Sequence, residues 1–195
     1  MIIGVLVTNY WECLQNKGVP LYNMQDGYSY DTSTSSCSTS GSGVWNRNAY
    51  AFEGISFDSC FGHPDQSSAY HNHLDPKCLY TKDSTKHSPI IGWMLDGYPI
   101  YGPYGYTTGT TTVQFMVTGY AKRTDMAGVR HTLLSSSGVT TTLTSSKYGP
   151  VIDSATLTYP WSGTTYPLGA FIEDWVWTSG SDLGKDIKLL FVSLD

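Results

Sequence analysis

The sequence predicts a mainly β protein, a single disulfide-stapled domain of short antiparallel strands. Its 195 residues suffice for one domain with a full core and are few for two. The composition is rich in residues of strands and turns, with 15 Tyr and 20 Gly, and poor in helix formers. Four cysteines, an even number, stand among Ser- and Thr-rich sequence. We therefore expect one domain over residues 1–195.

The strand candidates are short alternating runs separated by Gly, Pro and Ser. They cover residues 48–58, 111–121, 151–159 and 169–178. Asp96-Gly97, between "GWML" and "YPIY", predicts a hairpin, because Gly tolerates the positive φ that a type I′ turn requires. No long amphipathic helix is expected.

An internal sequence repeat suggests two related β units. Residues 2–23 ("IIGVLVTNYWECLQNKGVPLYN") and 90–102 ("IIGWMLDGYPIYG") share Ile-Ile-Gly, an apolar run and then Gly-x-Pro-(Leu/Ile)-Tyr. The first copy carries an insertion that holds Cys13.

The cysteines favour disulfides, because none of them has the Cys-x-x-Cys spacing of zinc or redox motifs. We expect Cys60 to pair with Cys78 and Cys13 with Cys37, since each pairing closes one compact loop. Such bridges predict an oxidising, extracellular or cell-surface location. Four buried free thiols in a cytosolic protein are the alternative.

Three of the five histidines lie between two cysteines, in the stretch "DSCFGHPDQSSAYHNHLDPKCL". His71 and His73 are two residues apart, so on a strand they point to the same face at a spacing of about 6.6 Å, and both can reach one ion. His63 supplies a third imidazole from the preceding loop. The alternative is that all three are hydrogen-bonded turn residues.

Three neutral imidazoles suit copper or zinc, and we rank these metals above calcium. The nearby Asp58, Asp65 and Asp75 are the oxygen donors that a calcium site would use. Asp58 or His87 is expected to support the cluster by hydrogen bonds that fix the ligand tautomers. His131 stands alone in "VRHTLL" and is expected to be structural.

Other function classes find little support in the sequence. The net charge is −5 and no basic run is present, which excludes nucleic acid as an expected partner. No apolar run approaches the roughly 20 residues of a membrane-spanning helix. Hydrolase, phosphate-loop and zinc-protease motifs are absent. Of the acidic neighbours Glu173 and Asp174, one is expected to satisfy a backbone turn.

The segment Tyr70-His71-Asn72-His73 resembles the signature of the YHYH protein family, with Asn72 in place of the second Tyr. The blocks "FDSCFGHP", "HSPIIGWMLDGYPIYGPYG", "PLGAFIEDWVW" and "GVPLYN" are also similar to that family. The resemblance covers most of the chain. It implies secreted or cell-surface β domains with the signature histidines in the defining site, and transfers no reaction.

Family members usually have further strands before the "IGV" block and a terminal strand after "EDWVW", so this chain is expected to be an incomplete domain. Exposed sheet edges would follow, and such edges favour self-association.

These observations predict an extracellular β domain that binds copper or zinc through His63, His71 and His73. The alternative is a structural or adhesive surface module, such as a fibre subunit, that contacts protein or glycan. An open coordination position would favour an enzyme, and a buried closed site would favour structure.

Overall fold

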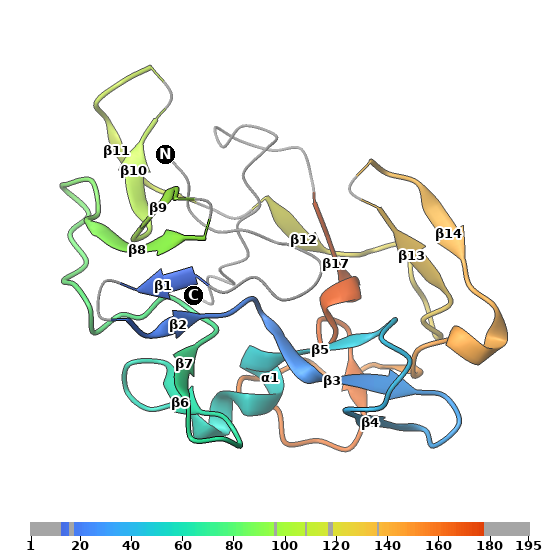
Figure 1. Cartoon of the computed structure of the whole chain (residues 1–195). Coiled ribbons are helices and arrows are strands. Elements are labelled where there is room, and N and C mark those ends of the chain that lie inside the picture. The colour runs from blue at the N-terminus through green and yellow to red at the C-terminus, as the bar shows by residue number, and fades with distance from the viewer. Residues whose placement is uncertain are drawn as a thin grey trace. The chain divides into compact units, whose positions relative to one another are not determined.

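The computed structural model describes residues 13–15, 18–95, 97–107, 109–116, 119–135 and 137–177. The fold is mainly β, with many short strands, one short helix and one disulfide, and the predicted fold class is confirmed (Figure 1). Most strand pairs are antiparallel; β2–β7 and β15–β16 are parallel. Among the described residues, no helix is long and apolar enough to cross a membrane.

The described chain forms two compact units, and each is discontinuous in sequence. Unit 1 contains residues 13–23 and 56–119, and unit 2 contains residues 24–55 and 120–177.

Unit 1 contains a six-stranded sheet with the order β6-β7-β2-β1-β8-β9. Its strands are β1 (Cys13–Gln15), β2 (Pro20–Leu21), β6 (Gly62–Pro64), β7 (Tyr70–Asn72), β8 (Ile90–Met94) and β9 (Pro99–Tyr101). A separate hairpin pairs β10 (Tyr104–Tyr106) with β11 (Val113–Phe115). Both edge strands of the six-stranded sheet contain a proline, which removes one N–H donor from each edge.

The internal sequence repeat corresponds to two adjacent hairpins of this sheet. β1 pairs with β2, β8 pairs with β9, and the inner strands β1 and β8 pair with each other antiparallel. Leu21 from the first hairpin and Ile100 from the second are both buried in one small core with Ile91. The Ile-Ile-Gly part of the first copy lies outside the described residues.

The two hairpins turn in the same way. Gly18 and Gly97 occupy equivalent positions with φ of 76° and 86°, values that glycine adopts without steric cost. Equivalent backbone bonds close the turns, from Gln15 N to Val19 O at 2.9 Å and from Met94 N to Tyr98 O at 2.8 Å. The hairpin predicted at Asp96-Gly97 is therefore confirmed, but three residues lie inside its closing pair instead of the two of a type I′ turn, and Asp96 lies outside the described residues.

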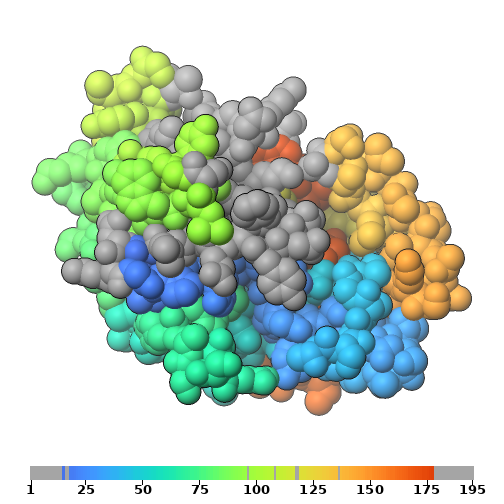
Figure 2. Space-filling view, in the orientation of Figure 1, coloured from blue at the N-terminus to red at the C-terminus, as the bar shows by residue number. Residues whose placement is uncertain are grey.

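Unit 2 combines one three-stranded sheet with several strand pairs. The sheet has the order β4-β3-β5, from β4 (Ser36–Ser38), β3 (Gln25–Asp31) and β5 (Asn46–Asn48). The pairs are β12 (Tyr120–Lys122) with β17 (Trp175–Trp177), β13 (Thr132–Leu134) with β14 (Thr140–Thr142), and β15 (Ile152–Asp153) with β16 (Tyr166–Pro167). Short 3-10 turns are η1 (Gly54–Ser56), which spans the boundary of the two units, and η2 (Ser145–Lys147) and η3 (Ile172–Asp174) in unit 2. All three residues of β14 are exposed, and this hairpin lies on the face seen in Figure 2.

The strand predicted over residues 48–58 is wrong, because α1 (Ala49–Glu53) and η1 occupy most of it. Asn48 caps the helix: its side chain accepts a hydrogen bond from Tyr50 N at 3.0 Å. Ala49 and Ala51, which have high helix propensity, are fully buried. The strands predicted over 151–159 and 169–178 are shorter than expected, and η3 replaces the middle of the second one.

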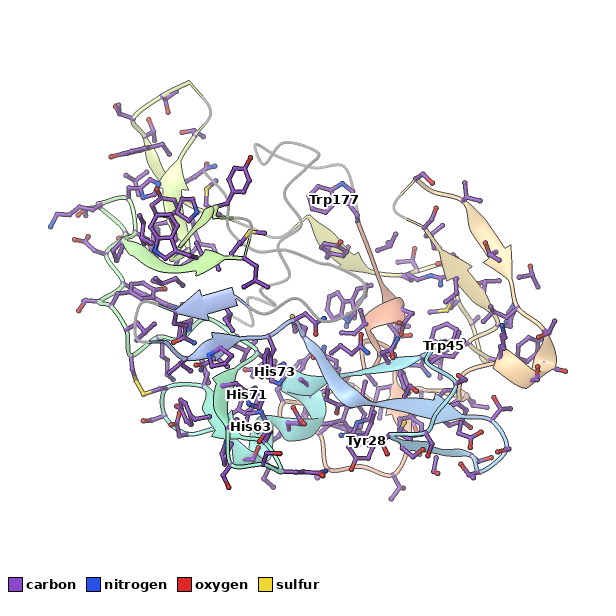
Figure 3. All side chains as sticks on the ribbon, viewed as in Figure 1. Tyr28, Trp45, His63, His71, His73 and Trp177 are labelled. Atoms are coloured by element: carbon purple, nitrogen blue, oxygen red, sulfur yellow. A yellow bond between two sulfur atoms is a disulfide. The ribbon has the colours of Figure 1, made fainter. Side chains whose placement is uncertain are left out.

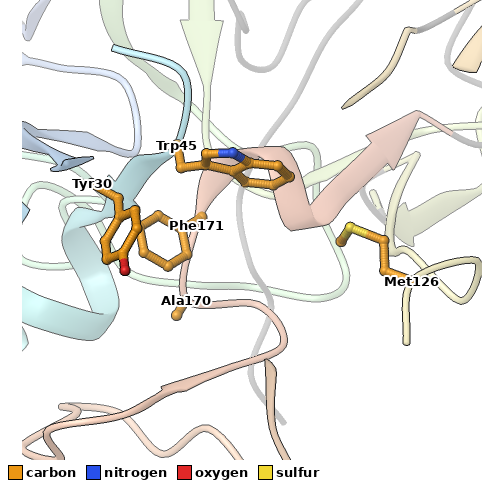
Figure 4. Packing of buried hydrophobic residues seen from close by; sticks show 5 residues of the cluster. All are labelled: Tyr30, Trp45, Met126, Ala170 and Phe171. Carbon is orange, nitrogen blue, oxygen red and sulfur yellow. The ribbon is translucent and has the colours of Figure 1, made fainter. Parts of the chain in front are cut away.

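The core of unit 2 is aromatic (Figure 4). Trp45 and Phe171 are completely buried, with their ring centroids 6.4 Å apart in an edge-to-face arrangement. Tyr30 packs edge-to-face on the same Phe171 ring. Such pairs add about 0.5–1.5 kcal/mol each beyond the area that they bury.

Cys37 lies at the border of this core and has a free thiol, so the predicted Cys13–Cys37 bridge is not formed. Its thiol is hydrogen-bonded with Tyr166, and burial raises the pKa of the thiol. Short loop length alone does not form this bridge, because packing against the aromatic cluster holds Cys37 in unit 2.

A fully buried ion pair between Arg130 and Asp174 connects the irregular segments of unit 2. The guanidinium donates to both carboxylate oxygens at 2.7 and 2.8 Å, and to the carbonyls of Pro150, Tyr166 and Pro167. Asp174 also accepts the backbone N–H groups of residues 169 and 171. One of the two acidic neighbours thus satisfies a turn, as expected.

Replacing Asp174 by Asn should lower the free energy of unfolding by about 3–5 kcal/mol, because Arg130 then remains buried without a countercharge. Urea denaturation measures this loss. Asp153→Asn is the matched control in the same unit, because the amide oxygen can keep the bond from Ala155 N. Equal effects of the two substitutions would contradict the role given to the ion pair.

Candidate metal centre

The antiparallel pairing of β6 with β7 brings the histidines together. Its register sets Gly62 opposite Asn72, His63 opposite His71 and Pro64 opposite Tyr70. His73 follows β7 directly, so its side chain returns to the same face as that of His71. The three histidines are neighbours in unit 1 (Figure 3).

The turn before β6 is built by Asp58 and closed by a disulfide. One carboxylate oxygen of Asp58 accepts the N–H groups of Cys60 at 2.8 Å and Gly62 at 3.1 Å. Cys60 is bonded to Cys78, which is 18 residues away, as the sequence predicted. This bridge restricts the loop that carries all three histidines and lowers the entropy cost of ordering it.

Tyr70, the first residue of the signature, fastens β7 to that turn. Its hydroxyl donates to the other carboxylate oxygen of Asp58 at 2.6 Å. This bond lowers the pKa of Asp58 and raises the pKa of Tyr70 to about 12. The Tyr70 ring lies against Gly62, in space that any side chain at position 62 would need. The signature tyrosine therefore positions the strand that carries the histidines.

The three imidazoles form one compact cluster. One ligand atom from each of His63, His71 and His73 lies within 4.8 Å of the others, and the Nε2 atoms of His71 and His73 are 3.0 Å apart. Two nitrogens that ligate one ion at 2.0–2.1 Å with a tetrahedral angle would be about 3.3 Å apart, so the 3.0 Å separation needs to widen by only a few tenths of an ångström to hold an ion. The relative exposure of the three residues is 5%, 4% and 5%.

Backbone carbonyls determine the tautomers of His71 and His73. Nδ1 of His71 is 3.1 Å from the carbonyl oxygen of Ala69, and Nδ1 of His73 is 2.5 Å from that of Asn23. A carbonyl can only accept, so both Nδ1 atoms carry the proton. In the neutral rings, the two Nε2 lone pairs then face each other across 3.0 Å. A cation between them would relieve this repulsion.

His63 is held from the rim of the cluster. Its Nδ1 is 2.8 Å from the hydroxyl of Ser56, which can donate or accept. Ser56 is solvent-exposed, so this hydrogen bond connects His63 to a residue at the surface. With Nδ1 engaged in this way, Nε2 is the ring nitrogen that His63 offers as a ligand atom.

Aromatic rings enclose the cluster. The Tyr22 ring is 4.6 Å from the His71 ring and 5.9 Å from the His73 ring, measured between centroids. Phe57 packs edge-on against His63 at 4.8 Å and lies parallel to His73 at 6.5 Å. These apolar walls exclude water from the side of the cluster that they cover.

Burial keeps two of the imidazoles neutral. The pKa of His73 is lowered to about 4: desolvation is the largest cause, the Asn23 carbonyl opposes it, and the neighbouring histidines add a smaller lowering. Desolvation, with a smaller effect of His71, also lowers the pKa of His63. Neutral imidazole is the form that ligates metals.

Asn72, the departure from the family signature, lies on the opposite face of β7 and is also buried. Its side-chain oxygen accepts a 2.7 Å bond from Gln15, and its amide donates to the carbonyl of Cys60. The substitution thus leaves the histidine face unchanged.

The predicted supporting residues do not support the cluster. Asp58 bonds Tyr70 and backbone N–H groups but no histidine. His87 lies between the Tyr101 and Tyr106 rings and is not a member of the cluster. Backbone carbonyls and the Ser56 hydroxyl hydrogen-bond to the histidines instead. A carboxylate that is close in the sequence need not point towards them.

The carboxylates considered for calcium have other partners. Asp65 accepts two backbone N–H groups of its own turn, and Asp75 accepts the Tyr80 hydroxyl and pairs with Lys82. His131 lies in unit 2, with its Nδ1 beside the Val129 carbonyl. Among the described residues, the histidine triad is the one group of three or more His, Cys, Asp or Glu side chains that could hold an ion.

The fold and the site together define a disulfide-stapled β protein with a buried histidine cluster. The YHYH protein family model matches residues 8–186, nearly the whole chain, and the chain belongs to this family. No curated protein and no solved structure matches it.

Three residues outside the predicted ligands and supporting groups also shape the site. Tyr22 and Phe57 enclose it, and Ser56 holds His63. Tyr22 and Phe57 lie in the blocks "GVPLYN" and "FDSCFGHP". The resemblance of these blocks to the family is the sequence signal that could have indicated both residues.

The metal-free protein should lose stability as the pH falls from about 6.5 to about 4. The pKa values of His63 and His73 are lower in the folded state than the ordinary 6.5, so the unfolded chain takes up protons first. Each such histidine contributes up to about 1.4 kcal/mol per pH unit. Denaturation across this range should give a shallower decline for His73→Asn and an unchanged one for His131→Asn. A wild-type slope equal to that of His73→Asn would contradict the assigned shift.

Gly62→Ala should lower the free energy of unfolding by about 1 kcal/mol, because its methyl group displaces the exposed Tyr70 ring and breaks the hydrogen bond to Asp58. Gly27→Ala is the control: this strand glycine has open space around its Cβ position. Thermal unfolding compares the two variants, and a neutral Gly62→Ala would remove the positioning role from Tyr70.

Proposed function

We propose that this protein is an extracellular β domain that binds one copper or zinc ion through His63, His71 and His73. The observation that carries the proposal is the 3.0 Å approach of the two Nε2 atoms whose Nδ1 partners are both carbonyls. Neutral imidazoles suit copper and zinc, while calcium prefers oxygen ligands.

The burial of the site supports metal retention in preference to catalysis. Each histidine is at most 5% exposed, and aromatic rings cover the cluster on the sides of Tyr22 and Phe57. A catalytic centre keeps a coordination position open to its substrate. The extracellular assignment is supported by the Cys60–Cys78 disulfide, which persists in oxidising compartments.

Protein isolated without chelators or a metal-affinity step should contain one copper or zinc ion per chain. His71→Ala or His73→Ala should remove most of it, because each change deletes a ligand, and His131→Ala should retain it. Elemental analysis measures the metal content. Occupancy should fall with pH only below the ordinary histidine range near 6.5, because burial lowers the pKa of His63 and His73 and protons compete for these imidazoles at lower pH. A protein that neither contains nor takes up copper or zinc would refute the proposed function.

A further inference from the structure

The histidine cluster is neutral, and nitrogen donors alone compose it. Among the described residues, no carboxylate or thiolate belongs to the group formed by His63, His71 and His73. The ion that it holds therefore keeps its full charge in a largely buried position. This charge balance discriminates between the metals that three imidazoles can bind.

We propose that the site selects monovalent copper, Cu(I), over the divalent ions Zn²⁺ and Cu²⁺. The inference rests on the proposed function, since it takes metal binding as given and names the ion and its oxidation state.

The electrostatic cost of burial favours a monovalent ion. The cost of taking an ion out of water rises with the square of its charge, so a divalent ion costs about four times as much as a monovalent ion of similar size. Buried zinc sites recover this cost through thiolates, carboxylates or a bound hydroxide. Tyr22 and Phe57 instead place rings against the cluster, which lowers the local polarity.

The number of donors in the cluster also favours Cu(I). Cu(I) has a filled d shell and is stable with two or three donors, whereas Cu²⁺ favours tetragonal sites with four or more. The cluster offers three imidazoles, of which His71 and His73 already have their Nε2 atoms 3.0 Å apart. The donor set is therefore complete for Cu(I) and incomplete for Cu²⁺.

The experiment is a competition under anaerobic conditions with the full chain. Metal-free protein is loaded with one equivalent of Cu(I) kept reduced by ascorbate, and its affinity is measured against the chromophoric Cu(I) chelator bicinchoninate. Zn²⁺ is titrated separately against a zinc indicator. We expect Cu(I) to bind at least about tenfold more tightly than Zn²⁺, equivalent to about 1.4 kcal/mol.

Two variants at the rim test the charge argument. Ser56→Asp places a carboxylate beside Nδ1 of His63, and Ser56→Asn has the same shape without the charge. Because residue 56 is exposed, both variants should fold. Ser56→Asp should lower the ratio of Cu(I) to Zn²⁺ affinity by about tenfold relative to Ser56→Asn, in which the changed hydrogen bond to His63 affects both ions without adding a charge.

The outcomes separate the two proposals. Tight Cu(I) binding that resists Zn²⁺, with a shift in Ser56→Asp alone, supports Cu(I) selection. Zn²⁺ binding equal to or tighter than that of Cu(I), or equal shifts in both variants, overturns the selection and leaves the proposed metal site standing. Binding of neither ion overturns both.

Discussion

The register of β6 against β7 is the constraint on which the histidine cluster depends. It sets His63 opposite His71, and a slip of one residue would turn one of them to the other face of the sheet. Three features outside the cluster hold this register: the Asp58 turn, the Tyr70 bond to that turn and the Cys60–Cys78 bridge. The signature tyrosine thus positions the strand that carries the signature histidines, which are the ligands of the proposed metal site.

Backbone carbonyls determine which nitrogens of His71 and His73 face each other. Ala69 and Asn23 each require a proton on Nδ1, so the Nε2 atoms present lone pairs to one another. Tyr22 and Asn23 follow β2, the second strand of the first repeated hairpin, and the Tyr22 ring packs against His71. The β2–β7 pairing places this hairpin beside the signature strand. The repeat therefore supplies both a wall and a tautomer-fixing carbonyl to the site.

Local patterns predicted the parts of the fold that local physics controls. The alternation of His71 and His73, the Cys60–Cys78 loop and the hairpin at Gly97 depend on a few neighbouring residues. The helix over Ala49–Glu53 was missed because the alternating aromatic pattern there hid an Asn cap and buried alanines. The supporting groups were missed because carbonyls are common to all residues and carry no sequence signal. The buried Arg130–Asp174 pair joins residues that are 44 positions apart, and no sequence motif predicts it.

The central claim is that one ion lies between the Nε2 atoms of the three histidines. An anomalous difference map from crystals of metal-loaded protein, recorded on both sides of the absorption edge of copper or zinc, tests it directly. The account predicts a single strong peak per chain, about 2.0–2.1 Å from the Nε2 atoms of His71 and His73, with His63 as the third ligand. Metal density elsewhere on the chain, or histidine side chains that point apart around an empty centre, would contradict it.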